Sequence, residues 1–206
     1  MFAWHFLADT GLLRDGTEPP PDGKWLEYAG KREMCCAGLH AAIKPLDALI
    51  YSPGPIICRV EIDTEGIIQQ HDKINVARRK ILWRYDASAA LRHFARLCAL
   101  DVIKFWDAPD IVVRYLRTGD LSSQPAVWAA AWDAALDAAG ARANAGARAA
   151  ARAGTAARAR DAAGTAARPW DAAWAAARDG AAANAGAWRK QNTRLCRMLM
   201  EQRKGD

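Results

Sequence analysis

The sequence predicts an α+β protein: a small mixed or antiparallel sheet domain with flanking helices over residues 1–124, followed by an Ala-rich, all-helical region over residues 125–206. Three observations predict this architecture. Short apolar runs separated by Pro- and Gly-containing turns fill the first 86 residues, which is typical of strands. A helical spacing of apolar residues replaces them from residue 87. Residues 126–190 then contain 33 alanines in 65 positions, and alanine is the best helix former.

The first elements of the domain are expected to be short strands. FAWHFL at 2–7 and the segment 25–28 are apolar and bounded by turn residues. Between them, EPPPDG at 18–23 excludes regular structure, because three prolines remove backbone donors and fix φ.

The stretch from Met34 to Asp63 is the centre of the predicted domain. It predicts a strand at Cys35-Cys36, a sharp bend at Gly38 and a short helix over residues 45–50, with proline at an early position where its missing N–H costs nothing. SPGP then ends the helix. The alternating, β-branched run at 56–62 predicts a central strand.

Helices follow a last strand, which is expected over residues 81–85. Apolar residues at helical spacing predict one helix over 87–106, and a second helix begins with Pro109 in its first turn. Residues 130–195 fall into blocks of eleven with loose similarity. They predict a helical hairpin or a bent rod, because Pro169 interrupts the tract.

Charge is distributed unevenly along the chain. Residues 1–125 carry 16 basic and 16 acidic residues, whereas residues 126–206 carry 13 and 7, so the whole formal charge of +6 lies in the tail. This asymmetry indicates an acidic partner, either nucleic acid or an acidic protein surface. The alternative is that the arginines only keep a solvated helix soluble.

Features of export and membrane insertion are not expected. The N-terminus has no basic segment followed by a long apolar one, and no uncharged apolar run of 18 residues occurs outside the alanine tract, which arginines interrupt. The protein is therefore expected to be cytoplasmic, with no membrane partner. Five cysteines, an odd number, indicate reduced thiols rather than a disulfide framework.

Candidate functional residues are polar groups in apolar surroundings: His5, His40 and Tyr51. A histidine inside an apolar strand is commonly structural, but three such residues near one sheet edge favour a site. Cys35, Cys36 and His40 could begin a zinc site, yet adjacent cysteines on a strand face opposite ways and no CxxC pair follows, so no metal is predicted. Cys35 could be a nucleophile with His5 or His40 as base, if the fold brings them together.

The layout resembles an uncharacterised family of phage-encoded proteins. The matching features are a WHF start, a C-x-G-L-H element ending at His40, a following P-x-D-A-L, and a long Ala/Trp/Asp/Arg tail that ends in Q-N-x-R-L. This resemblance covers nearly the whole chain. It implies a phage protein that acts in the cytoplasm of the host cell, without implying an activity.

Residues 2–86 also resemble the core of ADP-ribosyltransferases, through a first-strand histidine, a glycine turn, a helix ending in tyrosine and the strand ICRVEID. This resemblance implies NAD as cofactor, in a cleft that His5, His40 and Tyr51 face. His5 would hold the nicotinamide ribose and Tyr51 would stack on nicotinamide. Asp86, or less naturally Glu61, would steady the oxocarbenium-like transition state. The chain departs from that family in lacking a late-strand glutamate.

Three functions are compatible with these features. The first is a phage counter-defence protein, of anti-CRISPR type, or a host-modifying protein with an ADP-ribosyltransferase-like domain, active or degenerate, which the tail directs to a host macromolecule. The alternative is a non-enzymatic inhibitor that occludes a host protein complex or nucleic acid with its basic Ala-rich helices; nucleic-acid binding would depend strongly on salt. In the third, the tail makes a homo-oligomer through close helix contacts at small residues.

Overall fold

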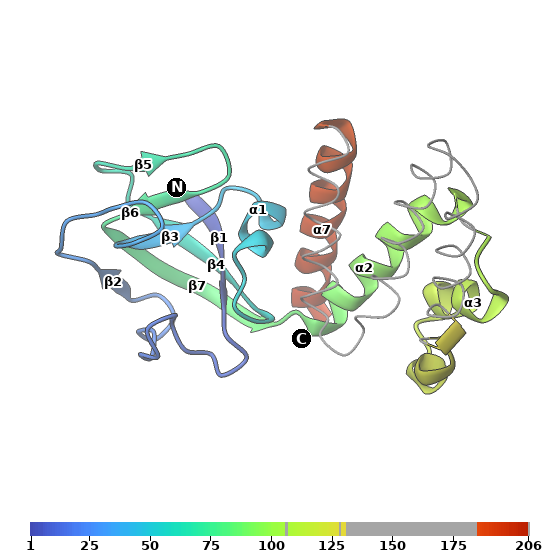
Figure 1. The fold of residues 1–206 in the computed structure, drawn as a ribbon. Helices are drawn as coiled ribbons and strands as arrows, with labels where there is room; N and C mark the ends of the chain where they lie inside the picture. The colour runs from blue at the N-terminus through green and yellow to red at the C-terminus, as the bar shows by residue number, and fades with distance from the viewer. Residues whose placement is uncertain (106, 128, 131–184, 206) are drawn as a thin grey trace. The chain divides into compact units, whose positions relative to one another are not determined.

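The computed structural model describes residues 1–105, 107–127, 129–130 and 185–205 (Figure 1). Within them the predicted α+β class is confirmed, since antiparallel sheets are combined with helices. The strands are β1 (Phe2–Leu7), β2 (Trp25–Glu27), β3 (Leu39–Ala41), β4 (Ile56–Ile62), β5 (Ile68–Gln69), β6 (Ile74–Val76) and β7 (Arg78–Asp86). The helices are α1 (Pro45–Ile50), α2 (Ser88–Val102), α3 (Asp110–Thr118) and α7 (Ala185–Gly205), with 3-10 turns at Ile103–Phe105 and Leu121–Ser123.

The expected bounds of β1, α1 and β4 are confirmed, but the strand expected at Cys35-Cys36 is wrong. Residues 34–36 form a turn that is closed by the amide of Ala37, which donates to the carbonyl oxygen of Glu33 at 2.9 Å. Cys35 adopts a left-handed φ of 68° in this turn, which a strand cannot accommodate. The strand of this region, β3, begins only after Gly38.

Two antiparallel sheets enclose the core of the N-terminal part. The four-stranded sheet has the order β1-β4-β7-β2, and the three-stranded sheet has the order β3-β6-β5. Only Ala77 separates β6 from β7, and backbone hydrogen bonds of 2.7 and 2.9 Å join Trp4 to Ala42, so the two sheets are connected at two points. The apolar side chains between them are Ala3, Leu7, Ala41, Cys58, Val60, Ile62, Ile74, Val76 and Ile81.

Side chains alternate along a strand, so the residues between the core positions point to the opposite face of the four-stranded sheet. Several of these residues are aromatic. Trp4 and Trp83 meet edge to face with ring centroids 5.8 Å apart. Helix α7 contacts this face: the guanidinium of Arg203 lies 4.8 Å from the Trp83 ring, and the hydroxyl of Tyr85 donates to the carbonyl oxygen of Leu199. Leu199 is fully buried, so α7 contributes to the core of this part.

The chain separates into two compact units. One unit comprises residues 1–90 together with 185–206, and the other comprises residues 91–184. This division differs from the boundary expected at residue 124, because α7 contacts α1 and, through Arg203 and Leu199, the four-stranded sheet. In the second unit α3 ends at Gly119. This residue adopts a left-handed φ of 72°, and its backbone amide donates a hydrogen bond to the carbonyl oxygen of Tyr115. The Ala-rich tract predicted as a hairpin or rod lies almost wholly outside the described residues.

None of the helices in the described ranges is long and apolar enough to cross a membrane.

Candidate functional site

A hollow of about 150 Å³ lies between α1 and the loop that joins β5 to β6. Helix α1 begins at Pro45, directly after Lys44, and places Asp47 in its first turn facing this hollow. On the other side, the amide of Gln70 donates to the carbonyl oxygen of Lys73 at 2.9 Å and closes the loop. Its lining residues are Ile43, Lys44, Asp47, Gln69, Gln70, His71, Asp72, Lys73 and Ile74.

The carboxyl group of Asp47 is the most unusual group in the hollow. Its side chain is only 4% exposed, and burial raises its pKa from 3.8 to about 6, with Lys44 opposing the shift and Asp72 adding to it. Within the described ranges, no residue makes a hydrogen bond or an ion pair with this carboxyl. A buried, perturbed and unpartnered acid in a hollow is typical of a functional site.

A polar network at the edge of the hollow joins Tyr51, Asp72, Lys73 and Cys35. The Tyr51 hydroxyl donates to Asp72 Oδ2, and Lys73 Nζ donates to the Tyr51 hydroxyl at 3.4 Å and to Cys35 Sγ at 2.9 Å. The Lys73 ammonium also lies 4.7 Å from the Tyr51 ring centroid. Burial and the Asp72 hydrogen bond raise the pKa of Tyr51, and the Cys35 contact raises that of Lys73. The hydroxyl and the ammonium therefore both keep their protons at neutral pH.

His40 on β3 extends the network toward the protein interior. Its Nε2 accepts a hydrogen bond of 3.0 Å from the backbone amide of Cys35 and lies 3.2 Å from Asn75 Nδ2. Burial, followed by the charge of Arg79, lowers the pKa of His40, so this nitrogen is unprotonated and free to accept. Gly38 is required here, because its φ is 109° and a Cβ would lie 2.2 Å from Asn75 Oδ1.

The structure connects some of the predicted residues and not others. His40 and Tyr51 are joined through Cys35 and Lys73, as described above. His5 lies opposite Cys58 on β4, and its pKa falls well below the ordinary value because of burial, then Arg79, then His40. It is therefore a neutral interior histidine next to His40 and Arg79.

The two acids that the resemblance suggested have other contacts. Asp86 at the end of β7 accepts a hydrogen bond of 2.8 Å from the amide of Ser88 and so caps α2. Glu61 pairs with Lys80 at 2.8 Å. The carboxylates in the hollow are instead Asp47 and Asp72, which sequence reasoning missed.

The missed acids did leave a signal in the sequence. Asp47 interrupts an otherwise apolar helix, PLDALI, and all of its neighbours from Pro45 to Leu49 are buried. An acid on a fully buried helix turn is rare unless it is paired or functional. Asp72 directly precedes Lys73 in a polar loop, where an exposed charge pair is the ordinary interpretation.

No three His, Cys, Asp or Glu side chains gather to hold a metal ion in the described part of the chain. Cys35, Cys36 and His40 in particular do not form such a group. Cys35 meets His40 through its backbone amide and meets Lys73 through its sulfur.

Comparisons with known proteins identify one similarity. No curated protein and no solved structure matches the chain significantly. The segment that does match, residues 20–93, contains the hollow and the whole polar network but excludes β1 and α7. It is similar to the family described as Domain of unknown function (DUF7666).

Proposed function

We propose that residues 1–86 form an ADP-ribosyltransferase-like domain that binds NAD at the hollow beside α1 and acts on a host macromolecule, as a phage counter-defence or host-modifying protein would. One observation carries the proposal. Tyr51, an aromatic side chain that is 46% exposed, is hydrogen-bonded to Asp72 beside a hollow that contains the unpartnered Asp47 carboxyl. An aromatic surface and carboxylates are two of the three features that the resemblance implies; the third, the ribose-binding histidine, would be His5, which does not line this hollow.

The chemistry assigns a role to each group. Transfer of ADP-ribose breaks the bond between the ribose anomeric carbon and the nicotinamide nitrogen, nicotinamide leaves as a neutral molecule, and a nucleophile of the target forms the new bond. Positive charge develops on the ribose in between, and a carboxylate fixed next to it stabilises that charge. In this proposal Asp72 or Asp47 takes the role that the resemblance implied for Asp86.

The size of the hollow restricts how NAD can bind. Pockets that enclose a whole drug-sized ligand measure about 300–1,000 Å³, whereas this hollow measures about 150 Å³. Only the nicotinamide end enters, and the remainder lies on the surface. Lys44 and Lys73, which line the hollow, supply positive charge for the pyrophosphate.

Calorimetric titration of NAD into the full-length protein tests this function. Wild type is expected to give saturable heat, Tyr51→Ala is expected to lose it, and Tyr51→Phe is expected to retain it because the ring remains. Phe2→Ala is the matched control, since Phe2 is an aromatic of similar exposure (56%) on β1. Absence of saturable heat from wild type at millimolar NAD would overturn the proposal.

Chromatographic detection of free nicotinamide then separates binding from catalysis. Asp72→Asn and Asp47→Asn are tested separately, and the variant that removes the stabilising carboxylate is expected to keep NAD binding and to lose nicotinamide release. If wild type binds NAD and releases no nicotinamide in the presence of host extract, the domain is a degenerate member that keeps only the binding site.

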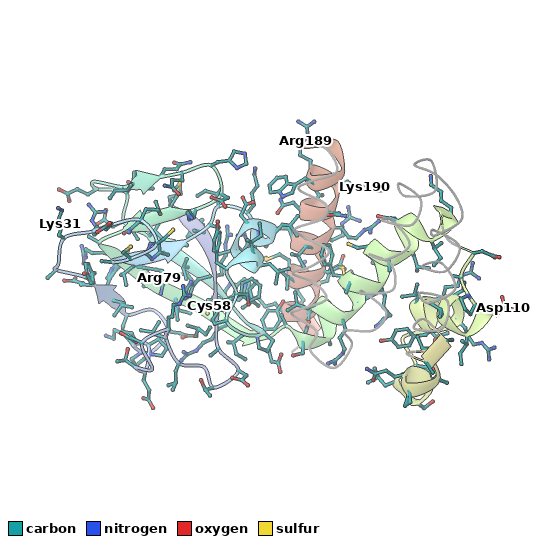
Figure 2. All side chains as sticks on the ribbon, in the orientation of Figure 1. Lys31, Cys58, Arg79, Asp110, Arg189 and Lys190 are labelled. Carbon is teal, nitrogen blue, oxygen red and sulfur yellow. The ribbon has the colours of Figure 1, made fainter. Side chains whose placement is uncertain are left out.

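A second function is a non-enzymatic inhibitor that occludes a host protein complex or nucleic acid with basic helices. The observation that favours it is that α7 exposes its basic residues, among them Arg189 and Lys190 near its start (Figure 2). If the partner is nucleic acid, anisotropy with a labelled duplex should show affinity that falls steeply with salt. The double variant Arg189→Glu, Lys190→Glu should weaken that binding, and unchanged affinity would exclude this helix as the contact.

A further inference from the structure

Arg79 is a buried charge in the interior of the unit formed by residues 1–90 and 185–206, which we call the sheet unit. It lies on β7, opposite Leu26 of β2 and Ile62 of β4, and its side chain is only 3% exposed. Burial lowers the pKa of its guanidinium to about 10, so the group is still protonated at neutral pH. Figure 2 shows Arg79 and Cys58 together within this unit.

No negative charge compensates Arg79 within the described part of the chain. Its Nη1 donates to the carbonyl oxygen of His40, and its Nε has no partner. Among the described residues, only the Cys58 side chain favours its charged form, but burial raises the pKa of that thiol to about 12, so the thiol is neutral. Asp22, an acid in the loop before β2, pairs with Arg84 at 3.3 Å. A buried charge with neither a counter-charge nor full hydrogen bonding is unfavourable unless a ligand completes it.

A second hollow lies next to Arg79, and we call it the Arg79 hollow. It is lined by Leu13, Pro19, Pro20, Lys24, Leu26, Arg79 and Ile81. Two of these residues are cations and none is an acid, while the rest are apolar. The enclosed space is about 10 Å³, which is the room that one water molecule occupies. That volume excludes a base, a sugar or a complete phosphate group, and it admits one water-sized group, such as a single oxygen of a ligand.

We propose that the Arg79 hollow receives one oxygen of the anionic end of a small ligand, a carboxylate or phosphate group whose other atoms lie at the mouth of the hollow, beside the two cations that line it, Arg79 and Lys24. The guanidinium offers planar donors that match the oxygens of either group, and its free Nε–H is one of them. The five apolar lining side chains exclude water and so strengthen the contact. The remainder of the ligand lies outside the hollow. This site shares no lining residue with the hollow beside α1 and does not depend on the NAD proposal.

Nitrogen-15 NMR of the arginine Nε–H groups in the full-length protein tests the site directly. The Arg79 signal is assigned by its loss in Arg79→Met, and sodium phosphate, acetate and chloride are titrated separately at matched ionic strength. We expect a saturable shift of this signal with phosphate or acetate, and whichever anion saturates identifies the source. Lys24→Gln, an exposed substitution, should weaken the affinity about fivefold, as expected for a partly exposed ion pair. Arg78→Gln is the matched control, because Arg78 is the neighbouring arginine and pairs with Glu27 at 3.0 Å.

Each outcome decides the proposal. If the Arg79 signal does not shift, or shifts linearly and equally with all three salts, the hollow is not an anion site. A saturable shift with chloride alone would overturn the assignment to a carboxylate or phosphate group. If Arg79→Met does not fold, the arginine Nε–H signal that saturates with the anion is followed instead, and the comparison of Lys24→Gln with Arg78→Gln still discriminates: equal affinities in the two variants would contradict the site.

Discussion

Replacing Asp47 by asparagine is expected to stabilise the protein at neutral pH. The folded protein raises the pKa of this carboxyl from 3.8 to about 6, so folding favours its protonated form. The stability that the protonated Asp47 carboxyl contributes is therefore complete below pH 3.8 and is lost as the pH rises past about 6. A difference of roughly two pKa units corresponds to at most about 3 kcal/mol in the free energy of unfolding above pH 7, and because the carboxyl group faces the open hollow and is only half enclosed by protein atoms, solvent screening reduces this to about 1–2 kcal/mol. Asparagine has no charge to desolvate and should recover most of this energy.

Urea denaturation of wild type and Asp47→Asn at pH 4, 6 and 8 measures the effect. The gain should be about 1–2 kcal/mol at pH 8, should shrink at pH 6 and should approach zero near pH 4. Glu65→Gln is the control, because Glu65 is exposed and outside the hollow, and it should show no such pH dependence. Destabilisation by Asp47→Asn at pH 8, or a change that is the same at all three pH values, would refute the argument that Asp47 is an unpaired buried charge.

Three further substitutions test the core, the glycine turn and the interior histidine. Leu199→Ala should destabilise by about 2–5 kcal/mol in urea denaturation, because the side chain is fully buried. Gly38→Ala should lower the melting temperature more than Gly23→Ala does: both positions have positive φ, but only at Gly38 does a Cβ collide with Asn75, at 2.2 Å. His5→Leu should reduce the loss of stability on acidification below about pH 6.5, since the lowered pKa of His5 makes the unfolded chain bind the extra proton.

Controls for these three predictions come from the same chain. Leu121→Ala should change stability little, because Leu121 is 51% exposed. Equal effects of Gly38→Ala and Gly23→Ala would show that the collision with Asn75 is relieved by a small shift. His71→Gln replaces an exposed histidine. If it removes as much of the acid sensitivity as His5→Leu, the interior position of His5 is not its cause.

Local signals in the sequence were sufficient for several elements of the fold. The strands β1 and β4 and the helix α1 have the expected bounds, because each is a compact apolar run ended by turn residues. The pair Cys35-Cys36 misled the prediction, since small apolar residues favour a strand only if they have a partner strand. Here a hydrogen bond from Ala37 to Glu33 closes a turn instead, and both thiols are exposed.

The candidate site was only half predictable for a physical reason. Tyr51 and His40 were visible as polar residues beside turns. Their connection depends on Lys73, which is 22 residues from Tyr51 in the sequence, and such a contact exists only once β6 pairs with β3. Arg79 was missed because it stands in the charged run RRK, which is typical of an exposed face. The alternation along β7 nevertheless requires that Arg79 share the inner face with Ile81, two residues later.

The buried charges of the sheet unit together favour a binding role over a purely structural one. Asp47 and Arg79 are opposite in charge, both more than nine-tenths buried, and neither has a charged partner within ion-pair distance in the described ranges. A fold selected for stability alone would pair them or replace them with apolar residues, and such replacement is often neutral or favourable. Each of them instead lines its own hollow. Asp47 lies in the hollow beside α1 with side chains of both charges, and Arg79 lies in the Arg79 hollow with a second cation, Lys24. An uncompensated charge at a hollow is retained where a ligand supplies the missing partner. We therefore expect both residues to lower the stability of the ligand-free protein and to contribute to its ligand affinity.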